Sequence, residues 1–257
     1  MPFDAESFRV RAREQKPKLG RPLMYKPVTG STNDDALLAA RTGAPHGSVF
    51  VADEQTAGRG RRGHSWLAAP GAGLLFSVLL RPKLELPQTS ALTLAIGLAL
   101  RDAVSQRIAE SADIKWPNDL LVNGKKLAGI LVESQLQGDR LQAVVVGIGL
   151  NVASREFPPE ITASATSLAL LGSARLEREP LLHDVLQAIS TRLDAYQRTG
   201  VAGILSELNA VDALRGKRVR VDDQVGIGCG LDEQGRLLLE DDAGSVHAIL
   251  SGTVELL

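Results

Sequence analysis

The feature that most constrains the fold is a change of sequence pattern near Gly216. Before it, helical periodicity recurs over residues 87–108 and 181–196, between short apolar runs. After it, residues 217–257 hold only short alternating runs separated by turns that contain Gly or Asp. That pattern is typical of a small, separately folded β-barrel or sandwich. We therefore predict a larger domain over residues 1–212 and a small β domain over residues 213–257.

The larger domain is predicted to mix strands and helices. Residues 47–52, 74–80 and 141–149 are apolar enough for buried strands, and Asn123-Gly124 between two apolar runs predicts a hairpin. A helix is expected to begin at Ser31, whose hydroxyl can cap it and which is followed by two acidic residues. The first thirty residues show no strong periodicity, so we expect an arm or a short strand there.

Composition excludes several classes of protein. The formal charge of the 257 residues is -1, so the chain is no general polycation for nucleic acid. Its one cysteine, Cys229, excludes an intramolecular disulfide framework and a multi-cysteine zinc cage. The N-terminus lacks the apolar run of a secretory signal, and no apolar stretch approaches the roughly 20 residues that span a bilayer. We expect a soluble, cytoplasmic protein with no membrane partner.

A glycine- and arginine-rich loop, residues 58–63, matches the spacing G-x-G-x-x-G of dinucleotide-binding proteins. That fingerprint requires the glycines to open a helix, which Pro70 and Gly71 prevent here. The loop instead combines close backbone approach with three guanidinium groups, which suits binding of phosphate or carboxylate oxygens. Nearby Trp66 favours a ligand with a planar ring. The alternative is a solvated basic loop.

A second polar cluster lies at the predicted hairpin. It comprises the run Lys115-Trp116-Pro117-Asn118-Asp119 and Lys126, which enters an apolar strand next to small residues. Lys126 could instead extend to solvent from the strand end. We find no Walker A motif, no HExxH spacing and no G-x-S-x-G elbow in the sequence. Cations without a nucleophile suit the attack of one anion on a phosphate, as in acyl-adenylate formation.

In sequence order, these motifs resemble those of the biotin–protein ligase family (biotin–acetyl-CoA-carboxylase ligases). The resemblance rests on Ser31-Thr32-Asn33, the run from Gln55 to Gly63 with Trp66, KWPND at 115–119, KLAGIL at 126–131 and GIGLNV at 147–152. It implies an α+β fold: a mixed β-sheet catalytic domain flanked by helices, like the core of class II aminoacyl-tRNA synthetases, with a small C-terminal SH3-like β-barrel. The implied reaction joins biotin and ATP, with Mg²⁺, into biotinyl-5′-adenylate. Biotin then passes to one lysine of a biotin carboxyl carrier domain, in acetyl-CoA carboxylase or a related carboxylase.

The resemblance also implies roles for individual residues. Arg59, Lys115 and Lys126 would be catalytic. The biotin-binding residues would be Ser31, Thr32, Asn33, Gln55, Arg59, Gly60, Arg61, Lys126 and Gly129. The adenylate or ATP would contact Arg61, Arg62, Trp66, Lys115, Asn118 and Asn151. Asp119 would hold Mg²⁺ or orient Lys115. Helix capping and loop bonding are the alternatives for Ser31, Thr32 and Gln55.

Some members of this family also carry an N-terminal winged-helix domain that represses transcription. Only 30 residues precede Ser31, and they show no helix-turn-helix pattern. We therefore expect a monofunctional ligase that binds no DNA and exists as a monomer or weak homodimer. Two alternatives stay open from the sequence. One is a lipoate–protein ligase, which shares the adenylate chemistry, and the other is a biotin or nucleotide sensor without turnover.

Overall fold

The computed structural model describes residues 2–15 and 17–257. The larger domain is built on a seven-stranded mixed sheet of order β1-β2-β3-β7-β6-β5-β4, in which β1 and β2 are parallel and the other neighbours antiparallel. Its strands are β1 (Leu23–Thr29), β2 (Val49–Gln55), β3 (Gly73–Leu80), β4 (Ala112–Lys115), β5 (Asp119–Val122), β6 (Lys125–Gln137) and β7 (Arg140–Asn151). Its helices are α1 (Ala5–Gln15), α2 (Thr32–Arg41), α3 (Leu86–Val104), α4 (Arg178–Thr199) and α5 (Leu205–Ala210), with a short 3-10 turn η1 (Arg61–Gly63).

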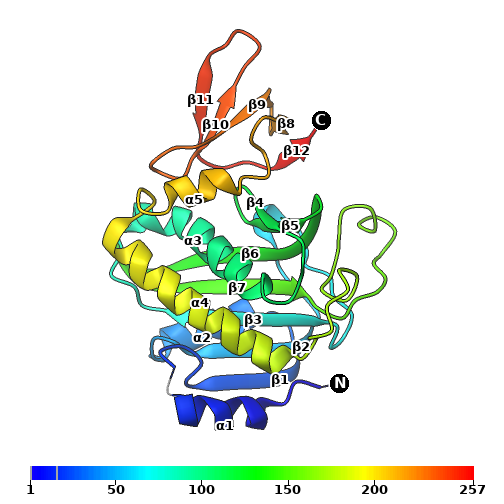
Figure 1. Cartoon of the computed structure of the whole chain (residues 1–257). Coiled ribbons are helices and arrows are strands. Elements are labelled where there is room, and N and C mark those ends of the chain that lie inside the picture. The colour runs from blue at the N-terminus through cyan, green and yellow to red at the C-terminus, as the bar shows by residue number, and fades with distance from the viewer. Residues whose placement is uncertain (1, 16) are drawn as a thin grey trace.

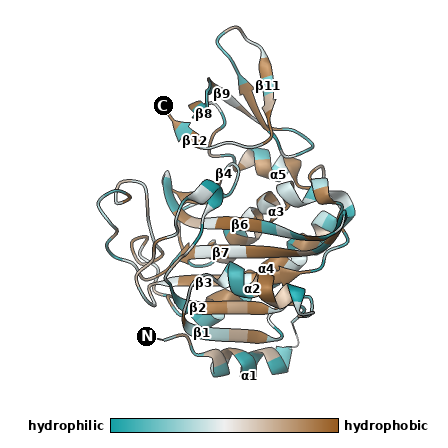
Figure 2. Cartoon of the chain, turned by 180° about the vertical axis from the view of Figure 1, so that it is seen from behind, coloured by the Kyte–Doolittle hydropathy of each residue, from teal (hydrophilic) through white to brown (hydrophobic). Residues whose placement is uncertain are grey.

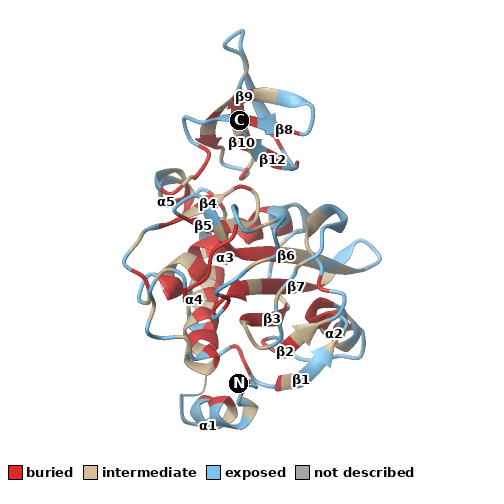
Figure 3. Ribbon diagram, turned by 90° about the vertical axis from the view of Figure 1, so that its right-hand side faces the viewer, coloured by how far each residue is buried: buried red, intermediate tan, exposed pale blue. Residues whose placement is uncertain are grey.

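Helices cover both faces of this sheet. Helices α3 and α4 lie over one face, and α2 lies over the other, as the front and rear views show (Figures 1 and 2). Successive side chains of a strand point to opposite faces. On β3, Phe76 and Val78 accordingly pack in the main core with α3 and α4, while Leu79 packs with α2. The central strands are therefore buried on both faces (Figure 3).

The C-terminal domain is a five-stranded antiparallel sheet of order β11-β10-β9-β8-β12. Its strands are β8 (Arg218–Val221), β9 (Gln224–Leu231), β10 (Leu237–Glu240), β11 (Val246–Ile249) and β12 (Val254–Leu256). A buried hydrogen bond from Trp116 Nε1 to the carbonyl oxygen of Gly235, 3.0 Å long, ties it to the larger domain. The predicted α+β architecture, with a mixed sheet followed by a small all-β unit, is confirmed.

The predicted hairpin is observed, because its turn residues have a strong conformational preference. Asn123 and Gly124 both have positive φ, at 52° and 74°, as the two-residue hairpin between β5 and β6 requires. The prediction for the first thirty residues was wrong in part, because a helix, α1, precedes the strand β1. Only Phe8 and Ala12 of α1 are buried, four residues apart, so its periodicity is weak and its helix depends on packing.

Among the described residues, no helix combines the length and the apolar character needed to cross a membrane.

Candidate active site

A cavity of about 260 Å³ opens on the face of the sheet that α2 covers. Small residues of β6 and β7 leave this space, since Gly129, Gly147 and Gly149 stand where larger side chains would project. A Cβ atom on Gly147 would lie 2.0 Å from Asn33 Oδ1, and one on Gly149 would lie 2.2 Å from Trp66 Cε2. The backbone of β7 therefore forms a floor on which α2 and the indole of Trp66 rest directly.

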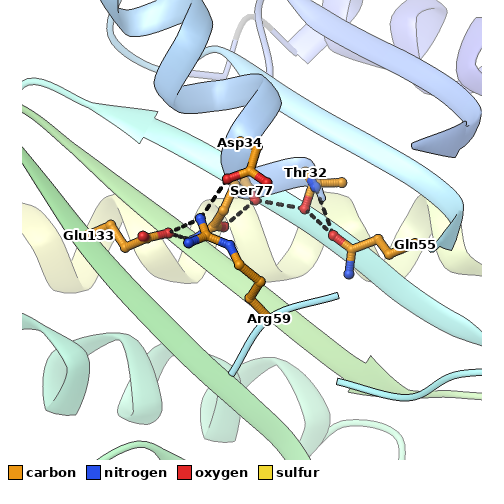
Figure 4. A network of polar contacts seen from close by, with 7 residues as sticks. Thr32, Asp34, Gln55, Arg59, Ser77 and Glu133 are labelled. Carbon is orange, nitrogen blue, oxygen red and sulfur yellow. Dashed lines mark hydrogen bonds and ion pairs between the residues drawn. The ribbon is translucent and has the colours of Figure 1, made fainter. Parts of the chain in front are cut away.

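One end of the cavity carries a network of neutral polar groups from α2, β2 and β3 (Figure 4). The backbone N–H and the hydroxyl of Thr32 donate to Gln55 Oε1 over 2.7 and 3.0 Å. Ser77 Oγ lies 2.7 Å from Thr32 Oγ1 and 2.6 Å from Asn33 Oδ1. Ser31 lines the cavity and its side chain makes no capping bond to α2, so its hydroxyl is not engaged as a helix cap. This end can bind an uncharged ligand group that both donates and accepts hydrogen bonds.

Arg59 closes the cavity at the side. Its Nη2 atom lies 2.7 Å from Asp34 Oδ1 on α2 and 2.8 Å from Glu133 Oε2 on β6, so the guanidinium group bridges two elements (Figure 4). Glu133 Oε2 also accepts a 2.6 Å hydrogen bond from Asn33 Nδ2. The glycine- and arginine-rich loop of residues 58–63, called the arginine loop from here on, is thereby held across the sheet by charge-assisted contacts.

Three further cations, Arg61, Lys115 and Lys126, line the same cavity. Lys126 Nζ lies 2.8 Å from Asp119 Oδ1 and 5.5 Å from the centre of the Trp66 ring. Burial lowers the pKa of Lys115, an effect that nearby Asp119 opposes and that Lys126 reinforces. Burial, followed by the neighbouring charge of Arg62, also lowers the pKa of Arg61, although a guanidinium group stays protonated at neutral pH. Partly desolvated cations held close together favour the binding of an anion between them.

The C-terminal domain supplies another wall of the cavity. Gly252, Thr253 and Val254 line it, although they lie far along the chain from the motifs of the larger domain. Arg62 Nη1 also forms a 2.6 Å ion pair with Asp222 Oδ1 in the turn between β8 and β9. The cavity therefore lies at the contact between the two domains. It combines a neutral polar end, a cluster of cations and an arginine loop that spans both.

Comparisons with known proteins agree with this geometry. Residues 25–151 match the model of the biotin/lipoate A/B protein ligase family, and residues 216–257 match that of the biotin protein ligase C-terminal domain. The chain is 39% identical to a biotin–acetyl-CoA-carboxylase ligase of Mycobacterium tuberculosis, over 88% of this chain and 85% of that protein. The chain belongs to the biotin protein ligase family.

A second relative and a solved structure are similar to the ligase over most of its length. It is 37% identical to the bifunctional ligase/repressor BirA of Bacillus subtilis, over 93% of this chain and 75% of that one. A biotin protein ligase from Aquifex aeolicus, solved in complex with biotin and ATP, superposes with a TM-score of 0.78 at 33% identity, covering 91% of this chain and 98% of that one. The match to the C-terminal domain of biotin protein ligases favours biotin over the lipoate alternative.

The structure brings nearly all of the ligase's predicted site residues to one cavity. The lining includes Ser31, Thr32, Asn33, Gln55, Arg59, Gly60, Arg61, Arg62, Trp66, Lys115, Asn118, Asp119, Lys126 and Gly129. Asn118 also donates through Nδ2 to the carbonyl oxygen of Ile130, over 3.2 Å, which fixes the KWPND turn against β6. Residues separated by nearly one hundred positions thus converge, as a shared site requires.

Asn151 is the exception. The structure places it outside the cavity lining, where Nδ2 donates over 3.0 Å to the carbonyl oxygen of Thr166 and lies 3.5 Å from that of Lys126. Thr166 N–H in turn donates to the carbonyl oxygen of Lys126 over 2.9 Å. Asn151 therefore orients the backbone around Lys126, and its expected contact with the nucleotide stays a prediction.

Sequence reasoning missed several groups at this site. Asp34 and Glu133 hold Arg59, and Ser77 joins the neutral network, yet none of the three stood out from the sequence. Glu133 could have been noticed, since it follows KLAGIL on the same strand with the alternation that points Gly129 into the cavity. The wall at residues 252–254 carried no such signal, because only domain packing brings it there.

Proposed function

We propose that this cavity is the active site in which the ligase joins biotin and ATP into biotinyl-5′-adenylate and then passes biotin to a lysine of a biotin carboxyl carrier domain. The observation that carries this proposal is the placement of Lys115, Lys126 and Arg61 beside the neutral network of Thr32 and Gln55 within one cavity. Biotin has a neutral ureido ring at one end and a carboxylate at the other, which matches these two environments.

The first step is an attack of the biotin carboxylate on the α-phosphorus of ATP. A carboxylate oxygen forms a bond to phosphorus while the bond to the pyrophosphate oxygen breaks, and pyrophosphate leaves. Both reactants are anions, so their approach is opposed by charge repulsion that fixed cations must offset. We assign the carboxylate and the developing charge to Lys126, and the α-phosphate to Lys115, whose partly buried ammonium group favours an anionic partner.

The second step transfers the acyl group. The amine of a carrier lysine attacks the acyl carbonyl carbon, the bond to AMP breaks, and the amine loses a proton as the amide forms. Water would compete with that amine, so the adenylate must be shielded until the carrier arrives. Arg59, held by Asp34 and Glu133, keeps the arginine loop across the cavity and would supply this shield.

Trp66 and Asp119 have more limited proposed roles. The indole of Trp66 lies against Gly149 in the cavity lining, and its buried Nε1–H meets no acceptor among the described residues. We infer that a bound nucleotide packs against this ring. Asp119 is paired with Lys126, and the described residues hold no cluster of three or more His, Cys, Asp or Glu side chains suited to a metal. We infer that Mg²⁺ arrives on the ATP phosphates, as a substrate partner, with Asp119 as at most one ligand.

The reaction can be tested by mass spectrometry of the purified chain incubated with biotin, MgATP and a carrier domain. We expect the carrier to gain one biotinyl group, and a carrier whose acceptor lysine is replaced by arginine to gain none. Lipoate in place of biotin should give no product. A lipoylated carrier would instead favour the alternative of a lipoate–protein ligase. Absence of biotin-dependent exchange of label between pyrophosphate and ATP would favour a sensor without turnover.

Three further properties of the ligase are proposed here: its domain boundary, its location and its assembly. We propose that the domain boundary lies between residues 212 and 213, close to the start of the second sheet at Arg218. We also propose that the ligase acts in the cytoplasm as a monomer or weak homodimer and binds no operator DNA. A specific shift of operator DNA in a gel, or a stable dimer in analytical ultracentrifugation, would contradict these proposals.

A further inference from the structure

Asp222 lies where the C-terminal domain meets both the arginine loop and the cavity wall. Its backbone N–H donates to the carbonyl oxygen of Thr253 over 3.2 Å, and its Oδ1 atom accepts from Thr253 N–H over 3.0 Å. The same oxygen forms the 2.6 Å contact with Arg62 Nη1. One carboxylate therefore joins the arginine loop to the segment that lines the cavity from the C-terminal domain.

The backbone conformations of Asp222 and Arg62 support a specific contact between them. Asp222 has φ 49° and Arg62 has φ 53°, both in the left-handed region that side chains other than Gly, Asn and Asp rarely adopt. Arg62 therefore occupies a costly backbone conformation inside η1, and its ion pair helps to offset that cost. The Arg62 bond is also the largest cause that lowers the pKa of the Asp222 carboxyl, so this group is ionised at neutral pH.

Ion pairs thus hold the arginine loop to both domains. Arg59 is fastened to Asp34 and Glu133 in the larger domain, and Arg62 is fastened to Asp222 in the C-terminal domain. We propose that Asp222 is a positioning residue that keeps residues 59–66 closed over the cavity, so that retention of the adenylate depends on the C-terminal domain. This inference rests on the function proposed above.

The strength of the Arg62–Asp222 contact suits a fastening that must open in every turnover. Both side chains are half-exposed, with 43% and 42% of their surface accessible, so water and salt screen the pair. Such pairs contribute modestly, which corresponds to a change of at most about fivefold in an opening equilibrium. A stronger, buried pair would hold the adenylate but would also obstruct the carrier lysine.

The variant Asp222→Asn removes the negative charge of this side chain and is designed to leave the fold unchanged. Asparagine keeps an oxygen acceptor for Thr253 N–H and tolerates the left-handed conformation, so the turn is expected to persist. We expect biotinyl-adenylate, formed in place and then chased with unlabelled biotin and ATP, to leave this variant about three to five times faster than the wild type in low salt. The difference should shrink in high salt, and the melting temperature should stay unchanged.

Asp223→Asn is the matched control, since it removes the same charge from the same turn and leaves the contact of Arg62 with Asp222 in place. Its release rate should equal that of the wild type. In a cycle with Arg62→Asn, the double variant should release adenylate no faster than the single Arg62→Asn variant. Unchanged release from Asp222→Asn, an equal change in Asp223→Asn, or additive effects would each overturn the proposal. A wild-type chain that forms no adenylate would instead refute the proposed function itself.

Discussion

Replacing Lys126 by methionine tests the electrostatic reasoning most directly. Methionine keeps much of the side chain's length and apolar stem, and the Lys126 side chain is 36% exposed, so the fold should survive. A unit charge about 4 Å from a reacting anion contributes roughly 4 kcal/mol at an effective dielectric constant of about 20. Loss of that contribution would lower kcat/KM for adenylation by about a thousandfold.

The structure adds a second effect to this prediction. Asp119, whose carboxylate lies 2.8 Å from Lys126 Nζ and is only 17% exposed, loses its partner in the Lys126→Met variant. Its charge would then repel the incoming phosphate and carboxylate groups. Adding Asp119→Asn to Lys126→Met should therefore recover part of the lost activity, about tenfold, although it removes another polar group from the site.

The assay is biotin-dependent exchange of labelled pyrophosphate into ATP, followed at several biotin concentrations. Lys125→Met is the matched control, since Lys125 is exposed on the neighbouring hairpin position and should leave exchange near the wild-type rate. The reasoning fails if Lys126→Met exchanges within tenfold of the wild type. It also fails if the loss is as large in Lys125→Met, or if the added Asp119→Asn lowers exchange further.

Three further predictions address other parts of the site. Because burial lowers the pKa of Lys115 and its charged form is needed, kcat/KM for ATP should fall with rising pH at a lower pH than an ordinary lysine would cause. Lys115→Arg should move this fall to higher pH, and a profile identical to the wild type would exclude Lys115 as its origin. Gly149→Ala should displace the indole of Trp66, which a Cβ would meet at 2.2 Å, and raise the KM for ATP about tenfold; an unchanged KM and tryptophan fluorescence would show that the indole needs no such floor. Arg59→Gln should shorten the lifetime of bound adenylate in the chase assay with little loss of stability, since the side chain is 39% exposed; an unchanged lifetime would remove Arg59 from the shield.

Much of the architecture could be predicted because its signals are local. The hairpin at Asn123-Gly124 needs two residues with positive φ, and few residue pairs adopt that conformation readily. The expected helix over residues 87–108 is observed as α3, with proline in its first turn, because the helical period of its apolar residues extends over several turns. Helix α1 was not predicted, because its two buried side chains give too short a hydrophobic pattern to indicate a helix.

The sequence by itself determined which chemistry the ligase carries. Its cations, its glycines and its neutral polar motif are residue types, and residue types follow directly from the chain. The tertiary structure alone decided which groups meet: that Asp34 and Glu133 hold Arg59, that Asn151 turns to Thr166, and that Asp222 reaches Arg62 from 160 positions away. Such contacts depend on how two sheets and their helices pack, and packing sums many weak interactions that no short stretch of sequence contains.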